Sequence, residues 1–137
     1  MNAAEVFFDT HVLLYLVSTD TGKAQIAESV VASGGHVSVQ VLNEFVSVAR
    51  RKARLDWPEI EEFLGVIREL CRVHPLTIES HDLACRLVRD QGLNFYDASV
   101  VASALLAGCK ALYSEDLQDG QVFRRTLRVQ NPFAGRR

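Results

Sequence analysis

The sequence alternates short apolar runs with longer segments of helical periodicity, and this alternation restricts the possible fold more than any other feature. Val6-Phe7-Phe8 is wholly apolar, as expected for a strand that is buried on both faces. Further strand candidates lie at 36–38, 73–78, 111–113 and 127–129. Helices are predicted at 11–18, 23–32, 40–53, 57–70, 80–91 and 95–106. This order predicts an α/β fold with a mostly parallel sheet and helices on both of its faces.

Composition and length fit one soluble domain. The chain has 137 residues, of which 48% are hydrophobic and 23% charged, and its net charge of −2 does not indicate a strongly basic nucleic-acid binder. Three cysteines without a C-x-x-C pair favour reduced, buried thiols. We expect no signal peptide, and the uncharged apolar run Val12–Val17 is far too short to span a membrane. A cytoplasmic protein with no membrane partner is therefore expected.

Two acidic residues follow predicted strands. Asp9 comes directly after the first strand, and Asp116 comes shortly after the strand at 111–113. In open α/β sheets, ligands bind outside the carboxyl ends of the strands. Each acid also has an ordinary structural explanation, since Asp9 could cap the next helix and the segment 114–120 could be a solvated turn.

Two further acids occupy apolar faces of predicted helices. Glu44 lies on the stripe formed by Val41 and Val48, where a carboxylate is costly unless it is paired, protonated or bound to a metal. Asp97 begins the apolar face of the last predicted helix. The structural alternatives are that Glu44 reaches water or an arginine from the edge of the stripe, and that Asn94 and Asp97 form a capping box.

Together the four acids indicate a metal site. Carboxylates that cluster repel one another unless protons or cations intervene, and hard oxygen ligands select Mg²⁺ or Mn²⁺. Such a metal can activate water and stabilise the charge that develops on a phosphate, so the pattern favours phosphodiester hydrolysis. The histidines and serines form no convincing nucleophilic triad in the sequence.

Four motifs, in this order, resemble those of PIN-domain ribonucleases. They are Phe8-Asp9-Thr10-His11-Val12-Leu13-Leu14, Leu42-Asn43-Glu44-Phe45, Tyr96-Asp97-Ala98 and Ser114-Glu115-Asp116. The length and the Asn131-Pro132-Phe133 ending are similar to those of VapC-type toxins. The resemblance covers nearly the whole chain. It implies a single PIN-like domain over residues 1–137, built as a three-layer α/β/α sandwich around a mostly parallel, five-stranded sheet.

The resemblance also implies an activity and a set of site residues. The activity is Mg²⁺- or Mn²⁺-dependent endonucleolytic cleavage of RNA by the toxin of a type II toxin–antitoxin pair. The positions that match the acidic quartet, as catalytic residues and metal ligands, are Asp9, Glu44, Asp97 and Asp116. Thr10 and Ser114 match the hydroxyls beside the quartet, and Asp119 matches a further acid. Gly120 departs from the pattern, because family members often have an aromatic residue there.

Basic residues suggest where a substrate would bind. Arg51 lies seven residues after Glu44, on nearly the same helix face and about 10 Å along it, so it could hold a phosphate. The alternative is a solvated helix end. The C-terminal segment is also enriched in arginine, at positions Arg124, Arg125, Arg128, Arg136 and Arg137.

The resemblance implies partners as well. These are a small antitoxin, whose arginine could enter the carboxylate site, and a second copy of the chain, for which the helix at 57–70 is a candidate surface. A non-catalytic PIN-like module that binds RNA or protein is the alternative function.

Overall fold

The computed structural model describes residues 2–135, and a six-stranded sheet lies at the centre of this part of the chain. The strands are β1 (Val6–Phe8), β2 (Gly35–Ser38), β3 (Cys71–His74), β4 (Ala111–Tyr113), β5 (Val122–Phe123) and β6 (Leu127–Gln130). Their order across the sheet is β3-β2-β1-β4-β6-β5, and every neighbouring pair is parallel except β5 and β6. β1 is therefore an interior strand.

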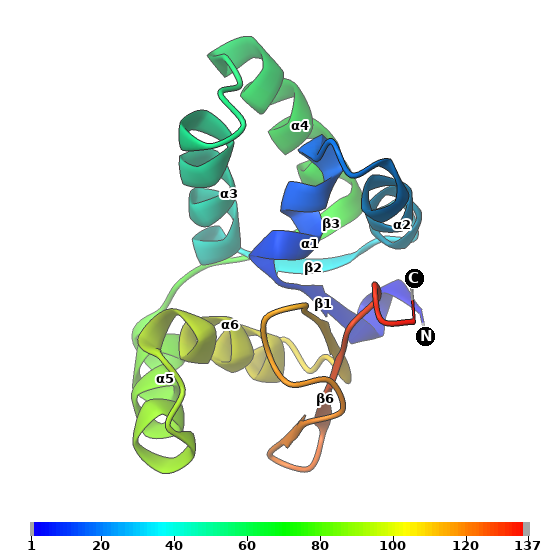
Figure 1. Cartoon of the computed structure of the whole chain (residues 1–137). Coiled ribbons are helices and arrows are strands. Elements are labelled where there is room, and N and C mark those ends of the chain that lie inside the picture. Colours follow the sequence, from blue (N-terminus) through cyan, green and yellow to red (C-terminus); the bar gives the residue numbers. More distant parts are fainter. Residues whose placement is uncertain (1, 136–137) are drawn as a thin grey trace.

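Helices cover both faces of this sheet. They are α1 (Thr10–Leu14), α2 (Thr21–Ala32), α3 (Val39–Arg51), α4 (Trp57–Leu70), α5 (Ile78–Gln91) and α6 (Phe95–Leu106), with short 3-10 turns η1 (Ala3–Glu5) and η2 (Tyr15–Val17). Figure 1 shows α1 to α4 grouped in the upper part of the view and α5 and α6 grouped apart from them, in the lower part. The predicted three-layer α/β/α sandwich is confirmed.

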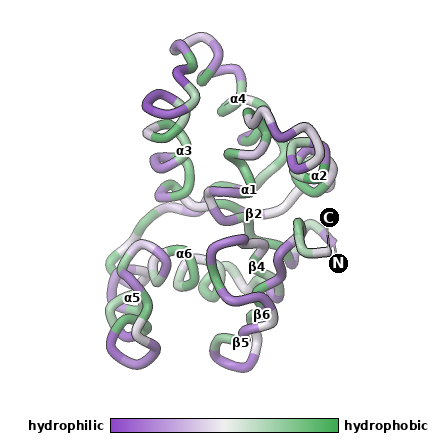
Figure 2. Tube along the Cα trace, in the orientation of Figure 1, coloured by the Kyte–Doolittle hydropathy of each residue, from purple (hydrophilic) through white to green (hydrophobic). Residues whose placement is uncertain are grey.

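Burial explains the sequence pattern of the central elements. Phe7 and Phe8 are fully buried because the faces of β1 are covered by helices and its two edges pair with β2 and β4. On α3, only one face is buried, which carries Val41, Phe45 and Ala49. Figure 2 shows the corresponding alternation of hydrophobic and hydrophilic positions along α3.

The third strand differs from its predicted bounds. β3 spans Cys71–His74 instead of 73–78 and begins directly after α4. Pro75 lacks a backbone N–H and follows the last residue of the strand. Thr77 and Ser80 then form a reciprocal capping box, so α5 starts at Ile78, two residues earlier than predicted.

Three other expectations need correction. The sheet contains one more strand than predicted, the short antiparallel β5. The helix predicted at 11–18 is a five-residue α1 that continues as the 3-10 turn η2. Cys71 and Cys109 are buried thiols as expected, but Cys85 is exposed on α5. No helix within residues 2–135 has the length and apolar character needed to cross a bilayer.

Candidate active site

Asp9 is the most deeply buried carboxylate at the carboxyl edge of the sheet. It follows β1, caps α1 and is only 5% exposed. Its Oδ1 accepts a hydrogen bond from the Thr10 backbone N–H at 2.7 Å, and its Oδ2 accepts one from the Ser114 hydroxyl at 2.8 Å. Burial, with a smaller effect of the charges of Asp116 and Asp97, raises the pKa of Asp9 to about 6 despite these two hydrogen bonds. Asp9 is thus both a helix cap and part of an acidic cluster.

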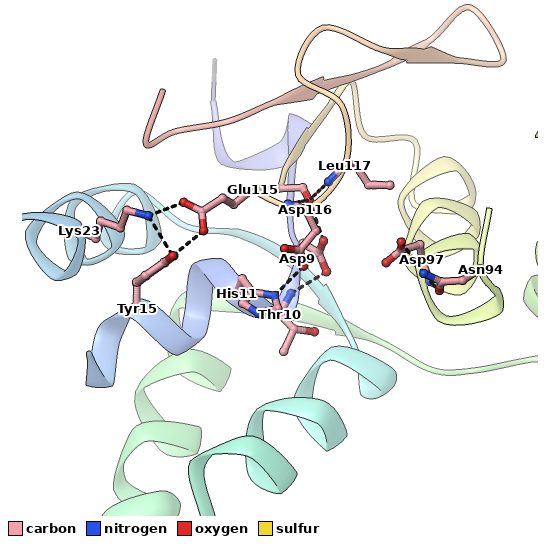
Figure 3. Close-up of polar contacts among 11 residues, drawn as sticks. Asp9, Thr10, His11, Tyr15, Lys23, Asn94, Asp97, Glu115, Asp116 and Leu117 are labelled. Atoms are coloured by element: carbon pink, nitrogen blue, oxygen red, sulfur yellow. Dashed lines mark hydrogen bonds and ion pairs between the residues drawn. The ribbon is translucent and has the colours of Figure 1, made fainter. Parts of the chain in front are cut away.

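Ser114 joins the ends of two neighbouring strands. It is fully buried directly after β4, which pairs with β1. While its hydroxyl donates to Asp9, its oxygen accepts hydrogen bonds from the backbone N–H groups of Asp116 and Leu117, each at 3.2 Å. The same hydroxyl therefore fixes the turn that carries Asp116. Figure 3 shows Asp116 beside Asp9.

Asp116 is paired with a histidine that the sequence analysis did not single out. His11 Nδ1 lies 2.6 Å from Asp116 Oδ2, and both side chains are about half exposed. His11 stands two residues after Asp9, in the first turn of α1. The signal that could have identified His11 is its place two residues after Asp9, the acid at the end of β1.

Asp97 approaches the same place from α6. Asn94 caps this helix and also donates from its amide to Asp97 Oδ2 at 2.8 Å, so the predicted capping box is present in part. Figure 3 shows the Asp97 carboxylate pointing toward Asp9 and Asp116. Partial burial raises the pKa of Asp97, and the charges of Asp116 and Glu44 add to this effect. The charges of Asp97 and Asp116 therefore act on Asp9, and those of Asp116 and Glu44 act on Asp97.

Glu44 lies on α3, at the edge of its buried face. The side chain is partly exposed, and Oε1 accepts a hydrogen bond from the Gln40 amide at 3.0 Å. Glu44 and Arg51 line the same open groove, which also contains Tyr96 from α6 and has a volume of about 470 Å³. The prediction that Arg51 shares a helix face with Glu44 is confirmed.

A second set of contacts holds the β4–β5 segment to α2. The Lys23 ammonium donates to Glu115 Oε2 at 2.7 Å and to the Tyr15 hydroxyl at 3.0 Å, and Tyr15 also donates to Glu115. The Tyr15 ring packs edge-on against Phe133, with the Lys23 ammonium 4.7 Å from the Tyr15 centroid. Because Glu115 precedes Asp116, this cluster helps to position the acidic turn (Figure 3).

Asp119 serves the chain differently from the four central acids. Its Oδ1 accepts a hydrogen bond from the Asn131 backbone N–H at 2.9 Å, and the side chain is exposed. Gly120 has a positive φ of +87°, so this turn requires a conformation that an aromatic residue rarely adopts. This explains the departure from the family pattern at Gly120.

The other basic residues are spread over the molecule. The Arg50 guanidinium lies 4.7 Å from the centroid of the Trp57 ring, outside the groove. Arg124 and Arg125 form the turn between β5 and β6. Arg136 and Arg137 lie outside the described residues.

The donor chemistry of the site fits a hard divalent cation. Its four carboxylates offer oxygen ligands, and within residues 2–135 only His11 forms an ion pair with any of them. The buried Thr10 Oγ1 has no hydrogen-bond partner in the described part of the chain. Within that part, no three histidine, cysteine, aspartate or glutamate side chains lie close enough together to hold a metal ion as they stand.

Comparisons with known proteins place this geometry in a family. A model of the PIN domain matches residues 6–126. Comparison with curated proteins gave no match. The fold is similar to that of Mycobacterium tuberculosis VapC20, described as a sarcin–ricin loop cleaving toxin, with a TM-score of 0.67, 23% identity and coverage of 82% of this chain and 90% of the other.

A second similar structure is VapBC2 from Rickettsia felis, bound to a DNA fragment from the promoter. Its TM-score is 0.64 at 12% identity, and the match covers 92% of this chain and 98% of the other. At these sequence identities the two structures show similarity of fold alone. The match to the PIN-domain model covers residues 6–126, which is most of the chain. The chain belongs to the PIN-domain family.

Proposed function

We propose that this chain is a divalent-metal-dependent endoribonuclease and the toxin of a type II toxin–antitoxin pair. The observation that carries the proposal is the convergence of Asp9, Glu44, Asp97 and Asp116, from four different segments, at the carboxyl edge of β1 and β4. The PIN family match and the VapC fold of VapC20 support it. A binding module without catalysis has no evident need for an acidic cluster of this kind.

The proposed roles follow from position and burial. Asp9, Asp97 and Asp116 would hold Mg²⁺ or Mn²⁺, with Glu44 as a further ligand or as an orienting group. When bound, the cation would supply a Lewis acid that activates water and stabilises charge on phosphate. Ser114 and Thr10 keep the Asp9 carboxylate in one orientation through their hydrogen bonds. His11 holds the Asp116 carboxylate through its Nδ1 contact.

The test is cleavage of a mixed RNA pool by wild type and Asp9→Asn, with Mg²⁺ or Mn²⁺ and then with EDTA. Wild type should cleave only with the metal, and Asp9→Asn should lose at least about a hundredfold in rate, because it removes a charge that the cation requires. Asp119→Asn is the matched control, since Asp119 Oδ1 only anchors the Asn131 backbone. It should retain activity.

Two outcomes would contradict the proposal. Equal cleavage by wild type and Asp9→Asn would show that another nuclease is responsible. Binding of RNA without cleavage by any variant, over a broad RNA pool, would favour the non-catalytic module.

The proposed protein partner is a small antitoxin encoded nearby. The R. felis structure is described as VapBC2, and an arginine from such a partner could pair with the carboxylates of the site. Co-purified antitoxin should inhibit RNA cleavage in proportion to its occupancy. Inhibition that disappears when its arginines are replaced would support a direct contact with the acids.

A homodimer stays a prediction for this chain. On α4, Ile60 and Ile67 face the core, whereas Trp57, Val66 and Leu70 are between 38% and 47% exposed. Light scattering of the purified protein checks the oligomeric state. If α4 forms the interface, Val66→Asp should yield a monomer with unchanged folding, whereas an unaffected dimer would place the interface elsewhere.

A further inference from the structure

The groove beside Glu44 contains groups that the metal site does not use. It runs between α3 and α6, and it is lined by Gln40, Asn43, Glu44, Ser47, Arg51 and Tyr96. Glu44 belongs to the acidic cluster, so any chain that lies in the groove also reaches the carboxylates. A volume of about 470 Å³ is within the usual range for a small-ligand site.

Tyr96 presents an aromatic ring at one wall of this groove. The residue is 64% exposed, although it immediately precedes Asp97 in the first turn of α6. Its ring is perpendicular to that of Phe95, with centroids 6.4 Å apart and an interplanar angle of 86°. Phe95 in turn contacts the His81 ring at 5.6 Å. The rings of Phe95 and His81 therefore support Tyr96 from one side. Within residues 2–135, no other ring is stacked face to face on Tyr96.

Arg51 presents a positive charge at the other wall. It is exposed in the last turn of α3, about two turns beyond Glu44. Among residues 2–135 no carboxylate pairs with its guanidinium, whereas the adjacent Arg50 is held over Trp57. An unpaired guanidinium beside an acidic centre suits a phosphate group of a nucleic-acid chain.

We propose that Tyr96 and Arg51 form a subsite for an unpaired nucleotide of the RNA, with the base stacked on the Tyr96 ring and a phosphate on Arg51. This inference rests on the proposed nuclease function and adds to it two residues that would bind single-stranded substrate. A base inside a duplex cannot offer its face to a side chain, so the subsite requires single-stranded RNA. Stacking tolerates any base, because every base has an aromatic face.

The test compares two probes on an Asp9→Asn background, which should bind RNA without cleaving it. One probe is a fluorescein-labelled oligouridine of about 12 nucleotides, and the other is a ribose–phosphate chain of the same length without bases. The ratio of their two dissociation constants isolates the contribution of the bases. We expect a ratio of at least about fivefold, the lower end of what one stacked base contributes.

Three variants assign that ratio to side chains. Tyr96→Ala should bring it close to unity, and Tyr96→Phe should restore it, since phenylalanine keeps the ring. Arg51→Ala should weaken the binding of both probes equally and leave the ratio unchanged. A ratio that is insensitive to Tyr96→Ala, or failure of both probes to bind, would overturn the subsite.

The two proposals can fail separately. Metal-dependent cleavage by wild type together with an unchanged ratio in Tyr96→Ala would leave the nuclease standing and remove the subsite. If the ratio of the two dissociation constants depends on Tyr96 but the protein cleaves no RNA, the subsite would stand and the nuclease function would be removed.

Discussion

Asp9 gives the metal-free protein an unusual dependence of stability on pH. Burial raises the pKa of Asp9 to about 6 in the folded state, whereas the pKa of an aspartate exposed to water is 3.8. Between these pH values the folded state binds more protons than the unfolded state. The free energy of unfolding should therefore fall most steeply as the pH rises from about 4 to about 6, and the loss over the whole titration is roughly 3 kcal/mol.

Urea denaturation in EDTA across this pH window measures the effect. Asp9→Asn keeps the side-chain shape but cannot titrate, so its free energy of unfolding should change less between pH 4 and pH 6. Parallel pH profiles for wild type and Asp9→Asn would contradict the assignment of the effect to Asp9.

At the scale of single residues, the sequence singled out the four acids but not the side chains beside them. Asp9 and Asp116 stood out because they follow strands. Glu44 stood out because a carboxylate on an apolar helix face is costly unless it is paired, protonated or bound to a metal. Tyr96 gave no such signal, since an aromatic residue at the start of an apolar helix normally joins the core. Only the packing of α6 against α3 shows that this ring remains exposed in a groove.

At the scale of elements, β1 and β2 approach so closely that one position requires glycine. A Cβ added to Gly35 would lie 2.7 Å from Phe8 Cε2 and 2.8 Å from the Val6 carbonyl oxygen. The carbonyl belongs to the backbone, so β1 would have to move. Gly35→Ala should lower the free energy of unfolding by about 1–3 kcal/mol and also reduce RNA cleavage, because Asp9 directly follows β1.

Gly65→Ala is the matched control for this prediction. Gly65 lies within α4, and an added Cβ would meet nothing within 4 Å. This substitution should raise the free energy of unfolding by up to about 1 kcal/mol, because alanine favours the helix. Urea denaturation of both variants gives the comparison, and equal destabilisation would contradict the explanation from close strand contact.

The elements that the sequence missed lack the usual local signals. The turn between β5 and β6 has positive φ at Arg124 and Arg125, and the Thr126 N–H donates to the Phe123 carbonyl at 3.1 Å. Such hairpin turns normally carry Asn-Gly or Asp-Gly, and without that pair β5 could not be identified. β1, by contrast, was predictable because its burial on both faces leaves the continuous apolar run Val6-Phe7-Phe8.

At the scale of the whole molecule, cation binding should stabilise the fold. The four acids come from the segments after β1 and β4 and from α3 and α6, so one ion would connect elements on both faces of the sheet. A cation that binds only the folded state adds about 2.7 kcal/mol to the free energy of unfolding at a hundred times its Kd.

Thermal unfolding with and without Mn²⁺ checks this linkage. At pH 7.5 the Tm of wild type should rise by several degrees, and the rise should be smaller at pH 4.5, where protons compete for Asp9. Asp9→Asn should show a reduced shift at both pH values. An equal shift in both proteins would place the ion elsewhere on the molecule.

The hydrogen bond between Ser114 and Asp9 also sets limits on how the chain can change in length. It depends on the register in which Phe8 lies beside Tyr113, and one inserted residue in β4 would turn every following side chain to the opposite face. The exposed connection at 52–54 carries no such constraint, because none of its side chains belongs to the acidic cluster. An inserted residue between α3 and α4 should therefore leave the acidic cluster intact, whereas one between β4 and Asp116 should separate Ser114 from Asp9.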